Sequence, residues 1–212
     1  MELNRRKRKQ TIGEEIANAI SHGVSGLFGI AGLVLLIVKA DNGGELASAI
    51  VFGLGMIFLY TMSALYHAFA KDGITKRVFK RFDHISIYVL IGATFAPVFI
   101  LVIDKPLGWI LLGVQWAIIT FGIVFKAVKI HKFQVIHIVS YLLLGWSALG
   151  LFGPLYQLSA PAFWLILAGG VSYTIGVFFY ATKLFKFSHF VWHLFVFGGT
   201  LCHFFAIFLF IF

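Results

Sequence analysis

Charged residues are scarce in this chain of 212 residues, where Asp, Glu, Lys and Arg together make up 12%. A soluble domain usually carries about 25% charged residues. Hydrophobic residues make up 60% of the chain, 25 Phe among them, and the mean hydropathy is +0.97. The shortage of charge argues against a soluble protein and predicts an integral membrane protein.

Cysteine is almost absent as well. Cys202 is the single cysteine, so no disulfide can form within the chain and the count says nothing about redox compartment. A cleavable signal peptide is not evident, because the basic start NRRKRKQ is followed by polar TIGEEIANAISHG and not by an apolar core. We therefore expect the first hydrophobic helix to be retained as an anchor.

Long apolar runs are abundant in the chain. Each is about the 20 residues that a bilayer requires, and none alternates as the strands of a membrane barrel do. Backbone groups in lipid must be satisfied within the segment, which favours helices. We predict an all-α membrane protein, a seven-transmembrane helix bundle over residues 17–212 that follows a basic cytoplasmic segment over residues 1–16. The expected spans are Ala17–Val38, Leu46–Phe69, Phe82–Ile103, Leu107–Ala127, Phe133–Phe152, Phe163–Thr182 and His189–Ile211.

The basic residues fall between these runs and fix a topology. The net charge is +9, and fifteen of the seventeen Lys and Arg residues belong to one side of the predicted bundle. By the positive-inside rule the N-terminus lies in the cytoplasm and the C-terminus outside. Since the charge is explained by topology, we expect no nucleic-acid partner. The residues on the basic side are Arg5, Arg6, Lys7, Arg8, Lys9, Lys71, Lys76, Arg77, Lys80, Arg81, Lys126, Lys129, Lys132, Lys183 and Lys186, against Lys39 and Lys105 on the other.

Four ionisable side chains inside the spans fall at one predicted membrane level, and such residues are costly and usually functional. His67 ends the second span, Asp83 opens the third, and His189 and His193 open the seventh, all on the cytoplasmic side. The spacing of His189 and His193 places both imidazoles on one helix face, about 6 Å apart in rise.

A metal site is the functional interpretation of this group. His67 would complete a three-histidine site with an open position for water, as in catalytic zinc sites. Asp83 would then be a partner of that water or a carboxylate behind the ligands. Each residue also has a plainer interpretation: the histidine pair can snorkel to the interface, Asp83 can cap its helix, and Ser63 can serve helix packing.

Two other sets of polar residues are weaker candidates. Glu15, Asn18 and His22 share one helix face near the start of the first span. They could close over the metal site, but we favour a solvated interfacial face. His203 lies ten residues beyond His193, about 15 Å deeper, which is too far to bind the same ion; we expect it to hydrogen-bond another helix.

Three motifs carry a family resemblance. SALYH over residues 63–67, RFDHISIY around Asp83 and HFVWH over residues 189–193 resemble the signature elements of the haemolysin III family. This family is the bacterial branch of the progestin and adipoQ receptor group, in the superfamily that includes alkaline ceramidases. The resemblance implies a zinc ion held by His67, His189 and His193, a water near Asp83, and support of the metal site or oxyanion by Ser63.

The predicted function follows from this resemblance and from the membrane setting. We expect a zinc-dependent hydrolase of the bacterial inner (plasma) membrane, acting on a lipid amide or ester through a zinc-bound water on the cytoplasmic side. The alternatives are a non-enzymatic protein of membrane homeostasis or sensing with a structural zinc, and a pore-forming haemolysin. The expected partner is membrane lipid; the sequence identifies no protein partner.

Overall fold

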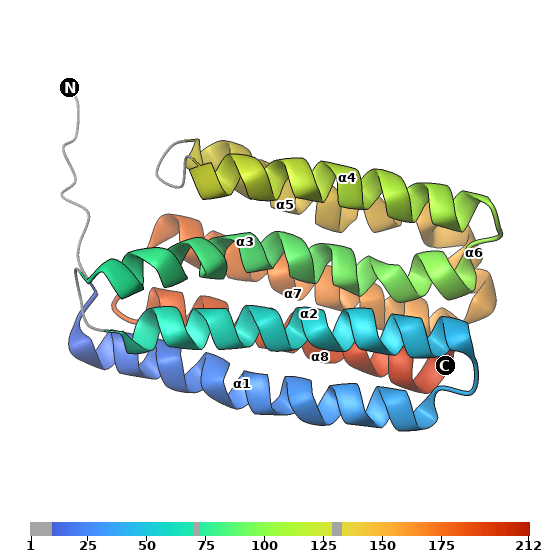
Figure 1. Cartoon of the computed structure of the whole chain (residues 1–212), viewed down its shortest axis with the longest axis horizontal. Coiled ribbons are helices and arrows are strands. Elements are labelled where there is room, and N and C mark those ends of the chain that lie inside the picture. Colours follow the sequence, from blue (N-terminus) through green and yellow to red (C-terminus); the bar gives the residue numbers. More distant parts are fainter. Residues whose placement is uncertain (1–9, 70–72, 129–132) are drawn as a thin grey trace.

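The computed structural model describes residues 10–69, 73–128 and 133–212, and in these ranges it is helical without a strand (Figure 1). Some helices continue into a short turn of different pitch: α3 into π-helical η1, α5 into the 3₁₀ turn η2 and α8 into π-helical η3. The elements are α1 (Ile12–Lys39), α2 (Gly43–Ala68), α3 (Ile74–Pro97), η1 (Val98–Val102), α4 (Leu107–Val128), α5 (Gln134–Trp146), η2 (Ser147–Leu151), α6 (Phe152–Leu158), α7 (Ala160–Thr182), α8 (Ser188–Ala206) and η3 (Ile207–Ile211).

Seven of the helical segments in the described ranges are long and apolar enough to cross a membrane, which confirms the predicted fold class. Several bounds differ from expectation, and two of the differences are the largest. The third span begins at Ile74 and not at Phe82, because a helix can continue past the apolar residues into a charged turn. The uncharged stretch over residues 153–161, expected to be a connection, is mostly helix α6 and the start of α7.

Helix α2 packs closely against α1 and α3, and α1, α2 and α8 contribute to one hydrophobic core. Their shared core includes Leu36, Phe52, Met56, Trp192 and Phe204. Glycine allows the close approach: a Cβ at Gly53 would lie 2.4 Å from a side-chain carbon of Leu33 on α1, and one at Gly55 would lie 2.4 Å from that of Ala93 on α3. Small residues serve this role in membrane helices generally.

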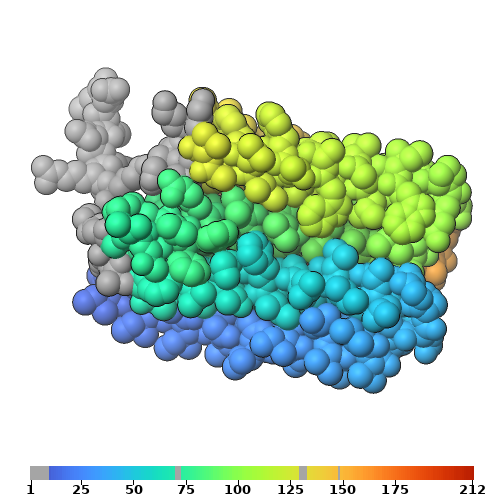
Figure 2. Space-filling view, in the orientation of Figure 1, coloured from blue at the N-terminus to red at the C-terminus, as the bar shows by residue number. Residues whose placement is uncertain are grey.

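The outer surface is apolar, as a lipid-facing surface should be. Large hydrophobic side chains on α1 and α4, including Leu27, Val34, Phe121 and Val124, are more than half exposed. The space-filling view shows α1, α2, α3 and α4 contributing to one broad face of the molecule (Figure 2). Soluble monomers rarely expose a continuous apolar surface of this kind.

One end of the bundle gathers the start of α1, the end of α2, and the starts of α3 and α8. Thr11 begins α1 through a capping box, in which its hydroxyl accepts from the Glu14 amide at 3.3 Å and the Glu14 carboxylate accepts from the Thr11 amide at 2.8 Å. Glu14 also accepts from the amide of Phe187, the residue before α8, at 3.0 Å. The first helix is thus tied to the start of the last one.

The described basic residues divide between the two ends of the bundle. Lys39 ends α1 at the far end and Lys105 lies in the connection after η1. Arg5 to Lys9, Lys71, Lys129 and Lys132 lie outside the described residues. The remaining basic residues belong to the end where α1 and α8 begin: Lys76, Arg77, Lys80, Arg81, Lys126, Lys183 and Lys186.

Candidate metal centre

Three histidines from two helices meet at this end of the bundle. His67 lies in the last turn of α2, and His189 and His193 occupy successive turns at the start of α8. Their ligand atoms all lie within 4.8 Å of one another, and the Nε2 atoms of His67 and His189 are 3.2 Å apart. Nitrogen ligands at about 2.0–2.1 Å from one tetrahedral ion lie about 3.3 Å from each other. The three imidazoles are therefore close enough to bind a metal ion, as the sequence predicts.

The hydrogen bonds behind two of these rings leave their Nε2 lone pairs facing the cluster. The Glu15 carboxylate lies 2.7 Å from Nδ1 of His67, so that nitrogen carries the proton and donates it to the carboxylate. Ser21 gives its hydroxyl hydrogen to the Asn18 carbonyl at 2.9 Å, and its oxygen can then accept from Nδ1 of His193 at 3.0 Å. This is the arrangement by which metal-binding histidines are usually oriented.

The burial of His67 and His193 also suits a metal site. His193 is fully buried and His67 is 3% exposed. The Nε2 atom of His193 has no hydrogen-bond partner among the described residues. Buried polar atoms are seldom left without a partner, and a lone pair directed at two other imidazoles is well suited to a cation.

Helix α1 supplies the outer layer of this cluster, and here the favoured interpretation of the sequence is wrong. Asn18 and His22 are 0% and 1% exposed, so this face is not solvated but covers the three histidines. The His22 ring stacks on that of His193 with centroids 3.5 Å apart and planes 7° apart. The helical spacing of Glu15, Asn18 and His22 identified this polar face of α1, but the spacing cannot distinguish a face that contacts protein from one that contacts water.

Glu15 is fixed in turn by the start of α3. Its second carboxylate oxygen lies 3.0 Å from Nζ of Lys76, and Lys76 lies over the ring of Tyr66 with Nζ 5.0 Å from the centroid. Glu15 therefore has one oxygen on His67 and the other on a lysine. A carboxylate held at both oxygens keeps the imidazole that it contacts in one orientation.

Asp83 and Ser63 lie beside the cluster but outside the three-histidine group. Asp83, on α3, is 5% exposed, and its Oδ2 lies 3.2 Å from Nδ1 of the neighbouring His84. Ser63, one turn before His67 on α2, is 1% exposed. Both line the same internal cavity as His22. Two roles stay predictions: that of Asp83 as the partner of a water, and that of Ser63 as a support of the metal site or oxyanion.

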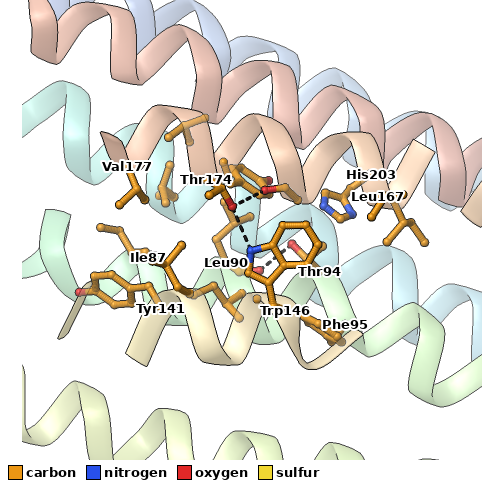
Figure 3. Close-up of a pocket in the computed structure, with 18 of the residues that line it drawn as sticks. Ile87, Leu90, Thr94, Phe95, Tyr141, Trp146, Leu167, Thr174, Val177 and His203 are labelled. Carbon is orange, nitrogen blue, oxygen red and sulfur yellow. Dashed lines mark hydrogen bonds between the residues drawn. The ribbon is translucent and has the colours of Figure 1, made fainter. Parts of the chain in front are cut away.

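The cavity runs along the bundle from these polar residues, between α2, α3, α5, α7 and α8. His22, Ser63 and Asp83 border one end, and Leu155, Phe163 and Ile207 border the other. Its walls are overwhelmingly apolar, with Ile87, Leu90, Phe95 and Leu167 in the section drawn in Figure 3. Asp83 and Val98, both in the wall, are fifteen residues apart along α3, or about 22 Å. His67, His189 and His193 are not part of this lining, but His22, which stacks on His193, is. An elongated apolar ligand could thus extend from His22 through most of the bundle.

Two further histidines do not join the cluster. His137, to which sequence analysis assigns no role, is buried on α5, and its Nδ1 lies 2.9 Å from the hydroxyl of Tyr88. His203 stacks on Tyr173 and makes no hydrogen bond among the described residues, so the expected bond to another helix is not found.

The fold and the site together define a class, a multi-pass membrane bundle of seven helices with three histidines at metal-binding distance near one end. The haemolysin-III related family matches residues 10–204, and the protein belongs to this family. The predicted resemblance is therefore confirmed.

Individual relatives match along most of their length. The chain is 36% identical over 202 residues to Hemolysin-3 of Bacillus cereus, covering 93% of this chain and 92% of that protein. It is 39% identical over 201 residues to Hemolysin-3 homolog of Bacillus subtilis strain 168, covering 93% and 94%. Monocyte to macrophage differentiation factor of Homo sapiens is 27% identical over 204 residues, with 94% and 85% covered. No solved structure gives a significant match.

Proposed function

We propose that this protein is a zinc-dependent hydrolase that cleaves an amide or ester bond of a membrane lipid. One observation carries the proposal: a cluster of three histidines lies behind His22, whose ring stacks on His193 and borders the polar end of a long apolar cavity. A lipid amide or ester has the same two parts, a polar carbonyl and a long hydrocarbon chain.

His67, His189 and His193 would hold the ion. Three protein ligands with an open fourth position are the pattern of catalytic zinc, whereas structural zinc is closed by four. Zinc was predicted by resemblance, and the all-nitrogen ligand set suits it. When bound, such an ion acts as a Lewis acid on a carbonyl and makes a coordinated water acidic near neutral pH.

The residues around the cluster have distinct parts in this proposal. Glu15 and Ser21 orient His67 and His193 through their Nδ1 atoms. The Asp83 carboxylate holds a water by hydrogen bonding and accepts its proton. His22, whose two ring nitrogens have no hydrogen-bond partner among the described residues, can donate to the carbonyl oxygen of the lipid together with Ser63.

We also propose an orientation in the plasma membrane, with the histidine end toward the cytoplasm. Most of the described Lys and Arg residues lie at that end, and cytoplasmic connections carry such an excess. Cleavage would then occur near the inner leaflet surface, with the lipid chain in the membrane interior.

The test is hydrolysis by the purified full-length protein in lipid nanodiscs, with bound zinc measured by mass spectrometry. Labelled ceramides, other N-acyl lipids and lipid esters are supplied, and released fatty acid is quantified. We expect turnover of at least one amide or ester, and none with His67→Ala. If a zinc-loaded preparation cleaves none of these lipids, the hydrolase proposal is wrong.

A second candidate is a structural zinc in a non-enzymatic membrane protein. The observation in its favour is that the three histidines join α2 to α8, so an ion would also hold helices together. Under this alternative, chelation lowers the melting temperature while no lipid is cleaved. Melting and turnover measured on one preparation distinguish the two candidates.

A further inference from the structure

His203 is a buried imidazole in the interior of the bundle, remote from the metal centre. It lies ten residues beyond His193 on α8, about 15 Å along the helix. Its side chain is 8% exposed and lines the apolar cavity (Figure 3). Neither ring nitrogen makes a hydrogen bond within the described part of the chain. Polar groups inside membrane spans usually have a partner or a function, so this one calls for a ligand.

The position of the ring is built into the fold. A Cβ at Gly169 on α7 would lie 2.6 Å from Nε2 of His203, so the glycine leaves the room that the imidazole occupies. One face of the His203 ring stacks on the ring of Tyr173, with the ring centroids 5.5 Å apart and an angle of 14° between the ring planes. Tyr173 is itself held through its hydroxyl, 2.9 Å from that of Thr200. A ring confined in this way is pre-organised for a contact.

The other polar groups of this section are already engaged as donors. Nε1 of Trp146 donates to the hydroxyl of Thr174 at 3.0 Å, and Thr174 donates to the Gly170 carbonyl at 2.8 Å. Thr94 donates to the Leu90 carbonyl at 2.7 Å. His203 is therefore the group here that can offer a lipid both a donor nitrogen and an acceptor nitrogen.

We propose that His203 forms a second polar subsite, which binds a hydroxyl group carried partway along the hydrocarbon chain of the ligand. This inference rests on the proposed function, since it assumes that an acyl chain occupies the cavity. The separation of about 15 Å from the metal-binding histidines corresponds to roughly a dozen carbons of an extended chain. The preferred ligand is thus a lipid with a mid-chain hydroxyl, and an unsubstituted chain leaves His203 without a partner.

The experiment measures fatty-acid binding and does not require turnover. Zinc-loaded full-length protein is titrated with stearic, 12-hydroxystearic and 7-hydroxystearic acids in competition with a fluorescent fatty acid. We expect the wild type to bind 12-hydroxystearic acid about threefold to tenfold more tightly than stearic acid, the range of one net hydrogen bond. The 7-hydroxy isomer places its hydroxyl too close to the metal centre and should show no such preference.

Two variants assign the effect to the imidazole. His203→Phe keeps an aromatic ring on Tyr173 but removes both nitrogens, and the preference for the 12-hydroxy acid should disappear. Thr174→Val removes a hydroxyl from the same section, and the preference should persist. Melting curves check that both variants fold; should His203→Phe fail to fold, the comparison of the two hydroxy isomers in the wild type decides.

The possible failures are distinguishable. If the wild type binds stearic and 12-hydroxystearic acids equally, or if His203→Phe keeps the preference, the subsite is overturned while the hydrolase proposal stands. If none of the acids binds, the cavity does not take acyl chains, and the subsite and the lipid part of the proposed function both fail.

Discussion

Helices α1, α2 and α3 pack closely in succession, and α8 packs closely against α7; these contacts form a first region, whereas in a second, looser region α5 makes few contacts with α3 and α7 beside the elongated cavity. In the first region glycines bring the helix backbones together, and the polar residues at its end are linked by specific hydrogen bonds. In the second, α5 is interrupted by a 3₁₀ turn, and its Gly145 faces open space. Under the proposed function, the first region would position the histidines, and the second would receive the hydrocarbon chain of the lipid.

The largest effect should come from removing a histidine of the cluster. His67→Ala leaves two ligands, and we expect bound zinc to fall from about one ion per chain to a trace, since three protein ligands are the usual minimum for zinc. Metal analysis of the purified variant measures this. His137→Ala is the matched control, because it removes a buried histidine outside the cluster and should keep its metal. Equal zinc in wild type and His67→Ala would contradict the site.

Glu15→Gln should weaken zinc binding by about 10- to 100-fold, the usual effect of removing a carboxylate behind a metal-binding histidine. The amide keeps the shape but loses the charge that faces His67 and Lys76. Competition with a chelator of known affinity gives the change. Glu45→Gln, at the other end of the bundle, should leave zinc affinity unchanged; an effect of equal size there would remove the specific role of Glu15.

Gly55→Ala tests the close packing of the first region. The added Cβ would lie 2.4 Å from that of Ala93, and overpacking of this kind costs about 1–3 kcal/mol of the free energy of unfolding. The melting temperature in detergent should drop accordingly. Gly113→Ala on α4 has open space around its new Cβ and should melt at the wild-type temperature or above it. Equal melting of the two variants would mean that α2 and α3 are not closely packed at Gly55.

The smallest effect on stability should come from filling the cavity. Gly145 lines it, and a Cβ added there would meet nothing within 4 Å, so Gly145→Leu should fold normally and keep its zinc. It should weaken the binding of stearic acid severalfold, because the new side chain occupies the space of the hydrocarbon. Fluorescent fatty-acid binding measures this, with Gly150→Leu as the control outside the cavity lining. Unchanged binding would indicate that the chain lies elsewhere.

Much of the architecture was predictable, since hydropathy alone defines the membrane spans. The meeting of His67 with His189 and His193 was predictable too, because helical spacing and the depth of each residue in its span are both properties of the sequence. The start of α3 was missed because hydropathy stops at the charged residues before Phe82, although the helix does not. The packing of α1 over the site was misjudged, since a polar helix face has the same pattern in water and against protein.

The cavity could not be predicted at all. It depends on side chains from seven α-helices that fail to fill the space between them, and no single stretch of sequence records that. The exposed position of Gly145 and the room that Gly169 leaves for His203 become visible only with the helices in place. The proximity of the three histidines was therefore easier to predict than the shape of the cavity near them.

The contact between His67 and His189 joins positions 122 residues apart, and this has a consequence for biosynthesis. The ribosome must complete nearly the whole chain, and the last helix must enter the membrane, before all three imidazoles can face one another. Nascent chains that still lack α8 contain His67 but neither His189 nor His193, so the three-histidine group cannot form before the last helix has been made.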